Sequence, residues 1–138
     1  MTSSDSTPML EAAGPNADQI AYWNDAAGPV WVAVQERRDR ELHGYGLAAM
    51  KALAPAEGER LIDLGCGCGD TSLELARRVG PSGAVTGVDI SAPMLQVART
   101  RAAAAGLAQT RFVQADVQQA DLPAADGAFS RFGVMFFA

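Results

Sequence analysis

The segment LIDLGCGCGD, residues 61–70, decides the fold because it joins a buried-strand pattern to a glycine-rich turn. Leu61 and Leu64 belong to a short apolar run that predicts a central strand, and an amphipathic helical pattern follows over residues 71–79. A tight turn from strand to helix leaves free backbone N–H groups above the carboxyl edge of the sheet. Glycine suits a turn that a ligand approaches closely or that needs a positive φ. We therefore predict a cofactor site at this turn.

The spacing of the glycines indicates which ligand the turn would bind. A dinucleotide fingerprint has the pattern GxGxxG, whereas this loop has Gly65, Gly67 and Gly69 at alternate positions. The fingerprint's third glycine position is occupied by Asp70, and Asp63 lies on the other side of the turn. Two flanking acids favour a ligand that carries an ammonium and a sulfonium over one that carries phosphates. A site for a nicotinamide dinucleotide is the alternative that the loop alone leaves open.

Acidic residues also follow the next two predicted strands. The strand over residues 84–89 ends in Asp89, which lies 26 residues after Asp63 (89 − 63). This spacing is close to the ~20-residue offset at which an acid meets ribose hydroxyls in such folds. After a predicted helix over residues 93–105, the strand over residues 111–115 is followed by Asp116. A single Asp at a strand end is as often a turn residue as a ligand. Three acids in register after three strands favour a rim that binds a nucleoside.

Together these motifs resemble those of class I S-adenosylmethionine-dependent methyltransferases of the small-molecule type (methyltransferase type 11). The most similar branch includes the ubiquinone and menaquinone biosynthesis methyltransferases. The matching segments are residues 61–70, 85–95, 112–117 and 126–132, the last of which would form the fourth strand. The resemblance implies an α/β fold, with a Rossmann-like parallel sheet, flanking helices and an N-terminal helical cap.

The resemblance also implies which residues would bind S-adenosyl-L-methionine. Asp63 and the glycine loop would hold the methionine end, and Asp89 would accept hydrogen bonds from the ribose hydroxyls. Ile90 would pack on the adenine, whose amino group would donate to Asp116. The complete implied cofactor-binding set is Asp63, Gly65, Cys66, Gly67, Gly69, Asp89, Ile90, Met94, Asp116, Val117, Ser130 and Arg131.

The implied activity is methyl transfer to a small-molecule acceptor by in-line displacement. The sequence offers no Ser/His/Asp set and no cluster of metal-ligand residues, so we predict neither a catalytic side chain nor a metal. His43, the only histidine, precedes a glycine, and we expect it at the C-terminal end of a helix. Holding donor and acceptor in a near-attack geometry can supply ~7–11 kcal/mol of the barrier, so a strong general base is unnecessary.

The two cysteines, Cys66 and Cys68, both lie in the glycine loop. A disulfide between residues two apart would strain the turn, and two thiols alone do not make a zinc site. Small side chains tolerated in a crowded loop are the expected role of both. Reduced thiols favour a cytoplasmic location, and their place beside a cofactor pocket predicts sensitivity to thiol reagents.

Length, charge and hydropathy limit the partners. A chain of 138 residues suits one domain. Its formal net charge of −5 argues against a nucleic-acid binder, which would carry a basic patch. No apolar run reaches the ~20 residues that span a bilayer, so stable membrane insertion is not expected.

The chain divides into three predicted regions: a flexible tail over residues 1–17, a helical cap over residues 18–56 and a cofactor-binding core over residues 57–138. Within the cap we expect helices over residues 18–27, 29–43 and 47–53, with Gly44 and Gly46 interrupting the last two. The aromatic residues of the cap, Tyr22, Trp23 and Trp31, suit either a lid over the cofactor or packing onto the sheet.

The apolar stretch over residues 133–138 carries no helix cap, charge or turn signal. We therefore expect a fold truncated after its fourth strand, whose open edge favours self-association. Two functions compete with the methyltransferase hypothesis. One is a non-catalytic fragment that binds cofactor or a partner chain, and the other is a nicotinamide-dependent oxidoreductase, which Asp70 and Asp116 disfavour.

Overall fold

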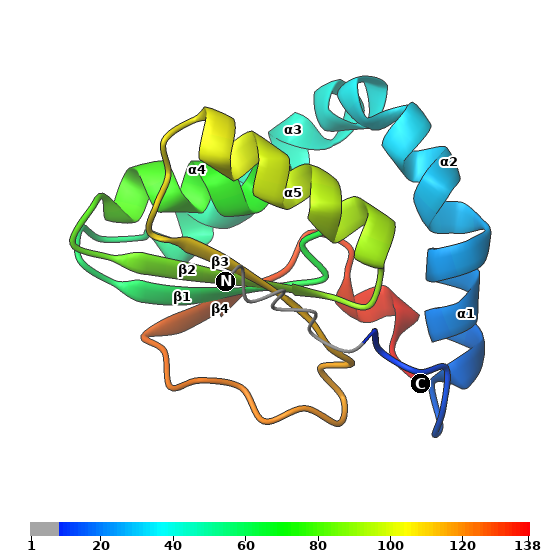
Figure 1. Ribbon diagram of the computed structural model, residues 1–138. Helices are drawn as coiled ribbons and strands as arrows, with labels where there is room; N and C mark the ends of the chain where they lie inside the picture. Colours follow the sequence, from blue (N-terminus) through cyan, green and yellow to red (C-terminus); the bar gives the residue numbers. More distant parts are fainter. Residues whose placement is uncertain (1–8) are drawn as a thin grey trace, which may run out of the picture.

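The computed structural model describes residues 9–138, in which three helices precede an alternating series of strands and helices (Figure 1). The elements are α1 (Ala17–Asp25), α2 (Ala27–Ala33), α3 (Gln35–Leu53), β1 (Arg60–Leu64), α4 (Asp70–Val79), β2 (Ala84–Asp89), α5 (Ala92–Ala104), β3 (Thr110–Gln114), β4 (Gly127–Phe129) and the 3₁₀ turn η1 (Val134–Phe136). Of the predicted tail, residues 1–8 lie outside the described part of the chain.

The four strands form one parallel sheet in the order β3-β2-β1-β4. In the central register Leu61 of β1 lies between Val85 of β2 and Gly127 of β4. The chain runs from β1 outward to β3 and then returns to place β4 on the other side of β1. The strand order therefore reverses between β1 and β4, and the carboxyl edge at such a reversal is where ligands of open α/β sheets bind. The predicted Rossmann-like fold class is confirmed.

Helices α4 and α5 lie on the same face of the sheet, and the connection over residues 115–126 runs along the other side (Figure 1). One buried cluster joins Leu75 of α4 to Leu61, Val85 and Phe129 of the strands, and a second joins Leu95 of α5 to residues of β3 and the glycine loop. Leu75 and Leu95 are fully buried, and burial of a leucine side chain contributes ~1.5–3 kcal/mol. These clusters fix α4 and α5 against the sheet, and the second also packs the glycine loop against α5.

Helix α3 runs without interruption through Gly44 and Gly46, so the prediction that these glycines break the helix is wrong. A glycine costs a helix only ~1 kcal/mol relative to alanine, and tertiary packing offsets that cost. Gly46 is buried, and a Cβ there would lie 3.3 Å from Nη1 of Arg131. The break falls instead at Val34 (φ −113°, ψ 17°), between α2 and α3. His43 is consequently an exposed residue inside α3, not at its C-terminal end as predicted.

The strand predicted over residues 126–132 is shorter in the structure, because β4 ends at Phe129. The Ser130 hydroxyl donates to the carbonyl of Leu64 at 2.8 Å and accepts from the N–H groups of Gly133 and Val134. These bonds turn the chain back over the glycine loop before η1. Within residues 9–138, no helix has the length and apolar character that crossing a bilayer would require.

Candidate functional site

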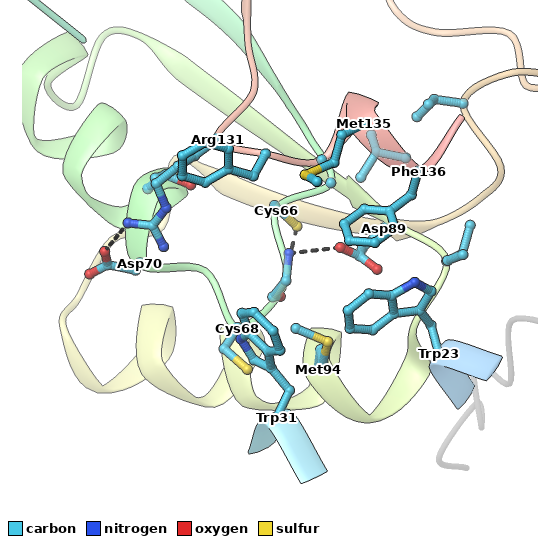
Figure 2. Close-up of a pocket in the computed structure, with 18 of the residues that line it drawn as sticks. Trp23, Trp31, Cys66, Cys68, Asp70, Asp89, Met94, Arg131, Met135 and Phe136 are labelled. Atoms are coloured by element: carbon cyan, nitrogen blue, oxygen red, sulfur yellow. Dashed lines mark hydrogen bonds and ion pairs between the residues drawn. The ribbon is translucent and has the colours of Figure 1, made fainter. Parts of the chain in front are cut away.

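A cavity of about 240 Å³ opens at the carboxyl edge of β1 and β2 (Figure 2). The glycine loop and the ends of β2 and β3 line one part of it, and α1–α3 and the segment after β4 line the rest. In Figure 2 Asp89 and Trp23 lie at one end, Asp70 and Arg131 lie at the other, and Cys66 lies between them. The cavity therefore has carboxylates toward both ends and one guanidinium, and the aspartates that line it are Asp39, Asp70, Asp89 and Asp116.

The glycines of the loop serve different purposes. Gly67 has φ +54° and lines the cavity, where a Cβ would lie 2.9 Å from the terminal methyl carbon of Met94. Gly65 has φ +70°, and a Cβ there would come within 2.7 Å of Cα of Gly133, which is backbone and cannot move aside easily. Gly65 therefore permits two backbones to cross, whereas Gly67 keeps open the space in which a ligand would lie.

Asp89 joins the two turns that border the cavity. Its Oδ2 accepts from the N–H of Gly67 at 2.8 Å, and its Oδ1 accepts from the N–H of Ser91 at 2.9 Å. Asp89 lines the cavity, and a carboxylate has acceptor capacity beyond these two bonds. Burial raises the pKa of Asp89, and the backbone hydrogen bonds partly offset that rise.

Asp63 lies behind the glycine loop and does not line the cavity. It is fully buried, and its Oδ2 accepts from the hydroxyls of Thr71 at 2.6 Å and Ser72 at 2.7 Å, in the first turn of α4. Its Oδ1 is buried and has no hydrogen-bond partner. Desolvation raises the pKa of Asp63 from 3.8 to about 6, against the lowering effect of the two hydroxyls.

At the other end of the cavity, two arginines and two aspartates form a chain of ion pairs. Arg131 Nη1 lies 2.8 Å from Asp70 Oδ2, and Arg101 Nη2 lies 2.9 Å from Asp39 Oδ2. Arg101 also approaches Asp70 at 3.8 Å and donates to the carbonyl of Cys68 at 2.8 Å. These ion pairs connect α3, α5 and the segment after β4 to the glycine loop.

The helical cap is anchored beside Asp89. The Asn24 amide donates to the carbonyl of Ile90 at 2.8 Å and accepts from the N–H of Ala92 at 2.9 Å. The buried Ser91 hydroxyl donates to the carbonyl of Trp23 at 2.8 Å. These bonds place the ring of Trp23 in the cavity wall, with ring centroids 5.2 Å from Phe136 and 5.8 Å from Trp31 in edge-to-face geometry.

Both cysteines are free and line the cavity. Burial raises the pKa of the Cys66 thiol well above its usual value, and it raises the pKa of Cys68 to about 12. Both thiols are therefore protonated near neutral pH and are poor nucleophiles. This argues against the predicted sensitivity to thiol reagents.

The structure brings most of the predicted site residues to the cavity. Those that line it are Gly65, Cys66, Gly67, Asp89, Ile90, Met94, Asp116, Val117 and Arg131, whereas Asp63, Gly69 and Ser130 lie outside the lining. Gly69 precedes α4 and packs on Ala98, and Ser130 holds the turn after β4. The prediction missed several lining residues, among them Asn16, Asp39, Leu42, Phe132, Gly133 and Met135. These reach the cavity through the packing of distant segments, for which no local motif exists.

A family model described as a methyltransferase domain matches residues 55–137. The chain is 41% identical over 86 residues to a 2-phytyl-1,4-naphtoquinone methyltransferase of Nostoc sp., covering 59% of this chain and 35% of that protein. It is 33% identical over 87 residues to a demethylmenaquinone methyltransferase of Staphylococcus aureus, covering 63% of this chain and 34% of that protein. The chain thus spans about a third of the length of these curated relatives.

Among solved structures, TrmN from Thermus thermophilus is similar with a TM-score of 0.58 and 30% identity, covering 62% of this chain and 26% of that chain. YcgJ from Bacillus subtilis is similar with a TM-score of 0.58 and 26% identity, covering 67% of this chain and 39% of that chain.

Proposed function

Since the chain belongs to the methyltransferase domain family, we propose that its cavity binds S-adenosyl-L-methionine and that the chain transfers the methyl group to a small-molecule acceptor. Family membership confirms the predicted resemblance. We propose three things beyond family membership: that these residues bind the cofactor, that the acceptor is a small molecule, and that this chain turns it over.

The observation that carries the proposal is the pairing of Gly67 with Asp89 at the reversal point of the sheet. Gly67 leaves open the space that a Cβ would fill, and the Gly67 N–H holds the Asp89 carboxylate at the edge of that space. The two carboxylate oxygens of Asp89 can accept hydrogen bonds from the two hydroxyls of a ribose. Ile90, Asp116 and Val117 line the same part of the cavity, where an adenine would lie.

The charged end of the cavity suits the amino-acid end of the cofactor. The Asp70 carboxylate is complementary to an ammonium, and the Arg131 guanidinium is complementary to a carboxylate. The two side chains pair with each other at 2.8 Å, and each is only partly exposed. The third-glycine position of a dinucleotide fingerprint is held by Asp70, whose charge would repel a pyrophosphate, so the nicotinamide alternative receives no support here.

When bound, the cofactor supplies an electrophilic methyl group on a sulfonium with a good leaving group. The chain's own residues bind and orient the reactants. Trp23, Trp31 and Phe136 in the cavity wall would exclude water from them. Among the acidic groups that line the cavity, Asp39 and Asp70 are paired with arginines, and both thiols are protonated. The other two, Asp89 and Asp116, would face the nucleoside part of the cofactor. We therefore propose an acceptor of the phenol or quinol class, whose own acidity supplies the nucleophile. The names of the two quinone methyltransferase relatives support this class.

We also propose that the protein is cytoplasmic, has no nucleic-acid partner and self-associates. Two free cysteines support a cytoplasmic location. The net charge of −5 supports the absence of a nucleic-acid partner, and the free edge of the three-residue strand β4 supports self-association.

The proposal is tested by isothermal titration of S-adenosylhomocysteine into Asp89→Ala. We expect affinity to fall by roughly 2–4 kcal/mol, because two charge-assisted hydrogen bonds at ~1.5–3 kcal/mol each are lost and water offsets part of them. Asp126→Ala is the matched control, since Asp126 also accepts a backbone N–H, from Arg60, but at the opposite end of the sheet. An analogue without ribose hydroxyls should lose little further affinity in Asp89→Ala. Additive losses, or preference for NAD, would contradict the proposal.

A further inference from the structure

Phe132 has a backbone conformation that needs an explanation. Its φ of +59° places a bulky residue in the left-handed region, which L residues other than glycine rarely adopt. Among residues 9–138, Ala54 (φ +52°) is the other such case, and it is accounted for as the left-handed cap that ends α3. Phe132 ends no helix. Strained residues of this kind persist only where the surrounding structure imposes them, and they cluster at functional sites.

The residues on both sides of Phe132 impose this conformation. Arg131 is tied to Asp70 at 2.8 Å, and the Ser130 hydroxyl accepts from the N–H of Gly133. Gly133 is packed so closely on the glycine loop that a Cβ there would lie 2.5 Å from the carbonyl oxygen of Leu64. The turn after β4 therefore leaves little freedom at position 132.

The strain is not offset by burial of the ring. Phe132 is 48% exposed and lines the cavity, and its ring meets the edge of Tyr45 at a centroid distance of 5.4 Å and an interplanar angle of 69°. Tyr45 is itself 61% exposed, on α3. A pair of exposed rings contributes little to the core, so stability does not account for the phenylalanine. The turn presents an aromatic ring at the cavity wall, and Tyr45 supports it from the side.

The surroundings of this ring indicate the chemistry that it would contact. Leu42, one helical turn before Tyr45, lines the cavity together with Trp31 and Met135. The charged groups that line this end of the cavity are ion-paired, Arg131 with Asp70 and Asp39 with Arg101. An apolar wall with aromatic rings and no uncompensated charge favours a planar, uncharged aromatic ring, which stacks or packs edge to face.

We propose that Phe132, supported by Tyr45, is a specificity-determining residue that contacts a planar, uncharged aromatic acceptor beside the cofactor. The proposal rests on the proposed methyl-transfer function and adds to it the residue that selects the acceptor. The left-handed turn after β4 is the device that holds this ring at the cavity.

The test separates the ring from the strain with three variants of the full chain. Phe132→Ala keeps the strain and loses the ring, Phe132→Gly loses both, and Phe132→Tyr keeps both. The probe is 2-naphthol, titrated by calorimetry with and without saturating S-adenosylhomocysteine. We expect the Kd for 2-naphthol to rise about 10-fold in the Ala and Gly variants and to stay within about 2-fold in the Tyr variant. The Kd for S-adenosylhomocysteine should stay within about 2-fold in all three.

A purely structural role would give a different order. Affinity for 2-naphthol would then follow the melting temperature and would recover in Phe132→Gly, where the strain is relieved. That result, or unchanged 2-naphthol affinity in both ringless variants, would overturn the inference. Failure of the unaltered chain to bind 2-naphthol would also overturn it while leaving the cofactor proposal intact. Failure to bind S-adenosylhomocysteine would instead reject the proposed function, and the titrations without it would still report on Phe132.

Discussion

The buried carboxylate of Asp63 should make the stability of this fold depend on pH. Burial raises the pKa of Asp63 from 3.8 to about 6, so the folded state binds an extra proton between these two values. Stability from this group is fully present below pH 3.8 and is lost as the pH rises through about 6. Each pKa unit corresponds to ~1.4 kcal/mol, so ionised Asp63 costs the fold about 3 kcal/mol at neutral pH.

The perturbation that isolates this effect is Asp63→Asn, which keeps the shape and removes the titration. Between pH 4.5 and 7.5 the unaltered chain should lose about 2 kcal/mol of unfolding free energy relative to the variant. In the variant, one polar atom of the new side-chain amide would replace Oδ1, which has no hydrogen-bond partner. Leaving an amide group unpaired lowers the free energy of unfolding by ~1–3 kcal/mol. That cost is the same at both pH values, so it cancels from the comparison. Asp89, whose pKa is also raised by burial, is present in both chains.

The assay is urea unfolding at pH 4.5 and 7.5, followed by tryptophan fluorescence, with Asp126→Asn as an exposed control. The control should show the same pH dependence as the unaltered chain. If Asp63→Asn also shows that same pH dependence, or if it loses stability relative to the unaltered chain as the pH rises, the reasoning about Asp63 is refuted.

Two further predictions concern the glycine loop. Gly67→Val should abolish S-adenosylhomocysteine binding in calorimetry while circular dichroism shows the fold retained, because the added side chain would occupy the cavity beside Met94; unchanged affinity would reject the site. Cys66 and Cys68, both buried and with raised thiol pKa values, should react slowly with Ellman's reagent at pH 7.5 and rapidly in urea; fast labelling of the folded chain would contradict this.

The local sequence alone determined the part of the fold that depends on neighbouring residues. The strand-loop-helix unit at residues 61–79 was predictable because apolar periodicity and glycine spacing act within one segment. The carboxyl ends of parallel strands meet at one edge, so the pattern also brought Asp89 and Asp116 to the same cavity as Gly67.

Only the tertiary structure decided the features that depend on contacts between distant segments. Gly46 stays helical because it packs against Arg131, and Asp63 lies behind the loop because Thr71 and Ser72 hold it there. Phe132 reaches the cavity through a left-handed turn that Gly133 and Ser130 impose on it. Such positions have no sequence signal of their own, because the energy that fixes them comes from packing against residues far along the chain.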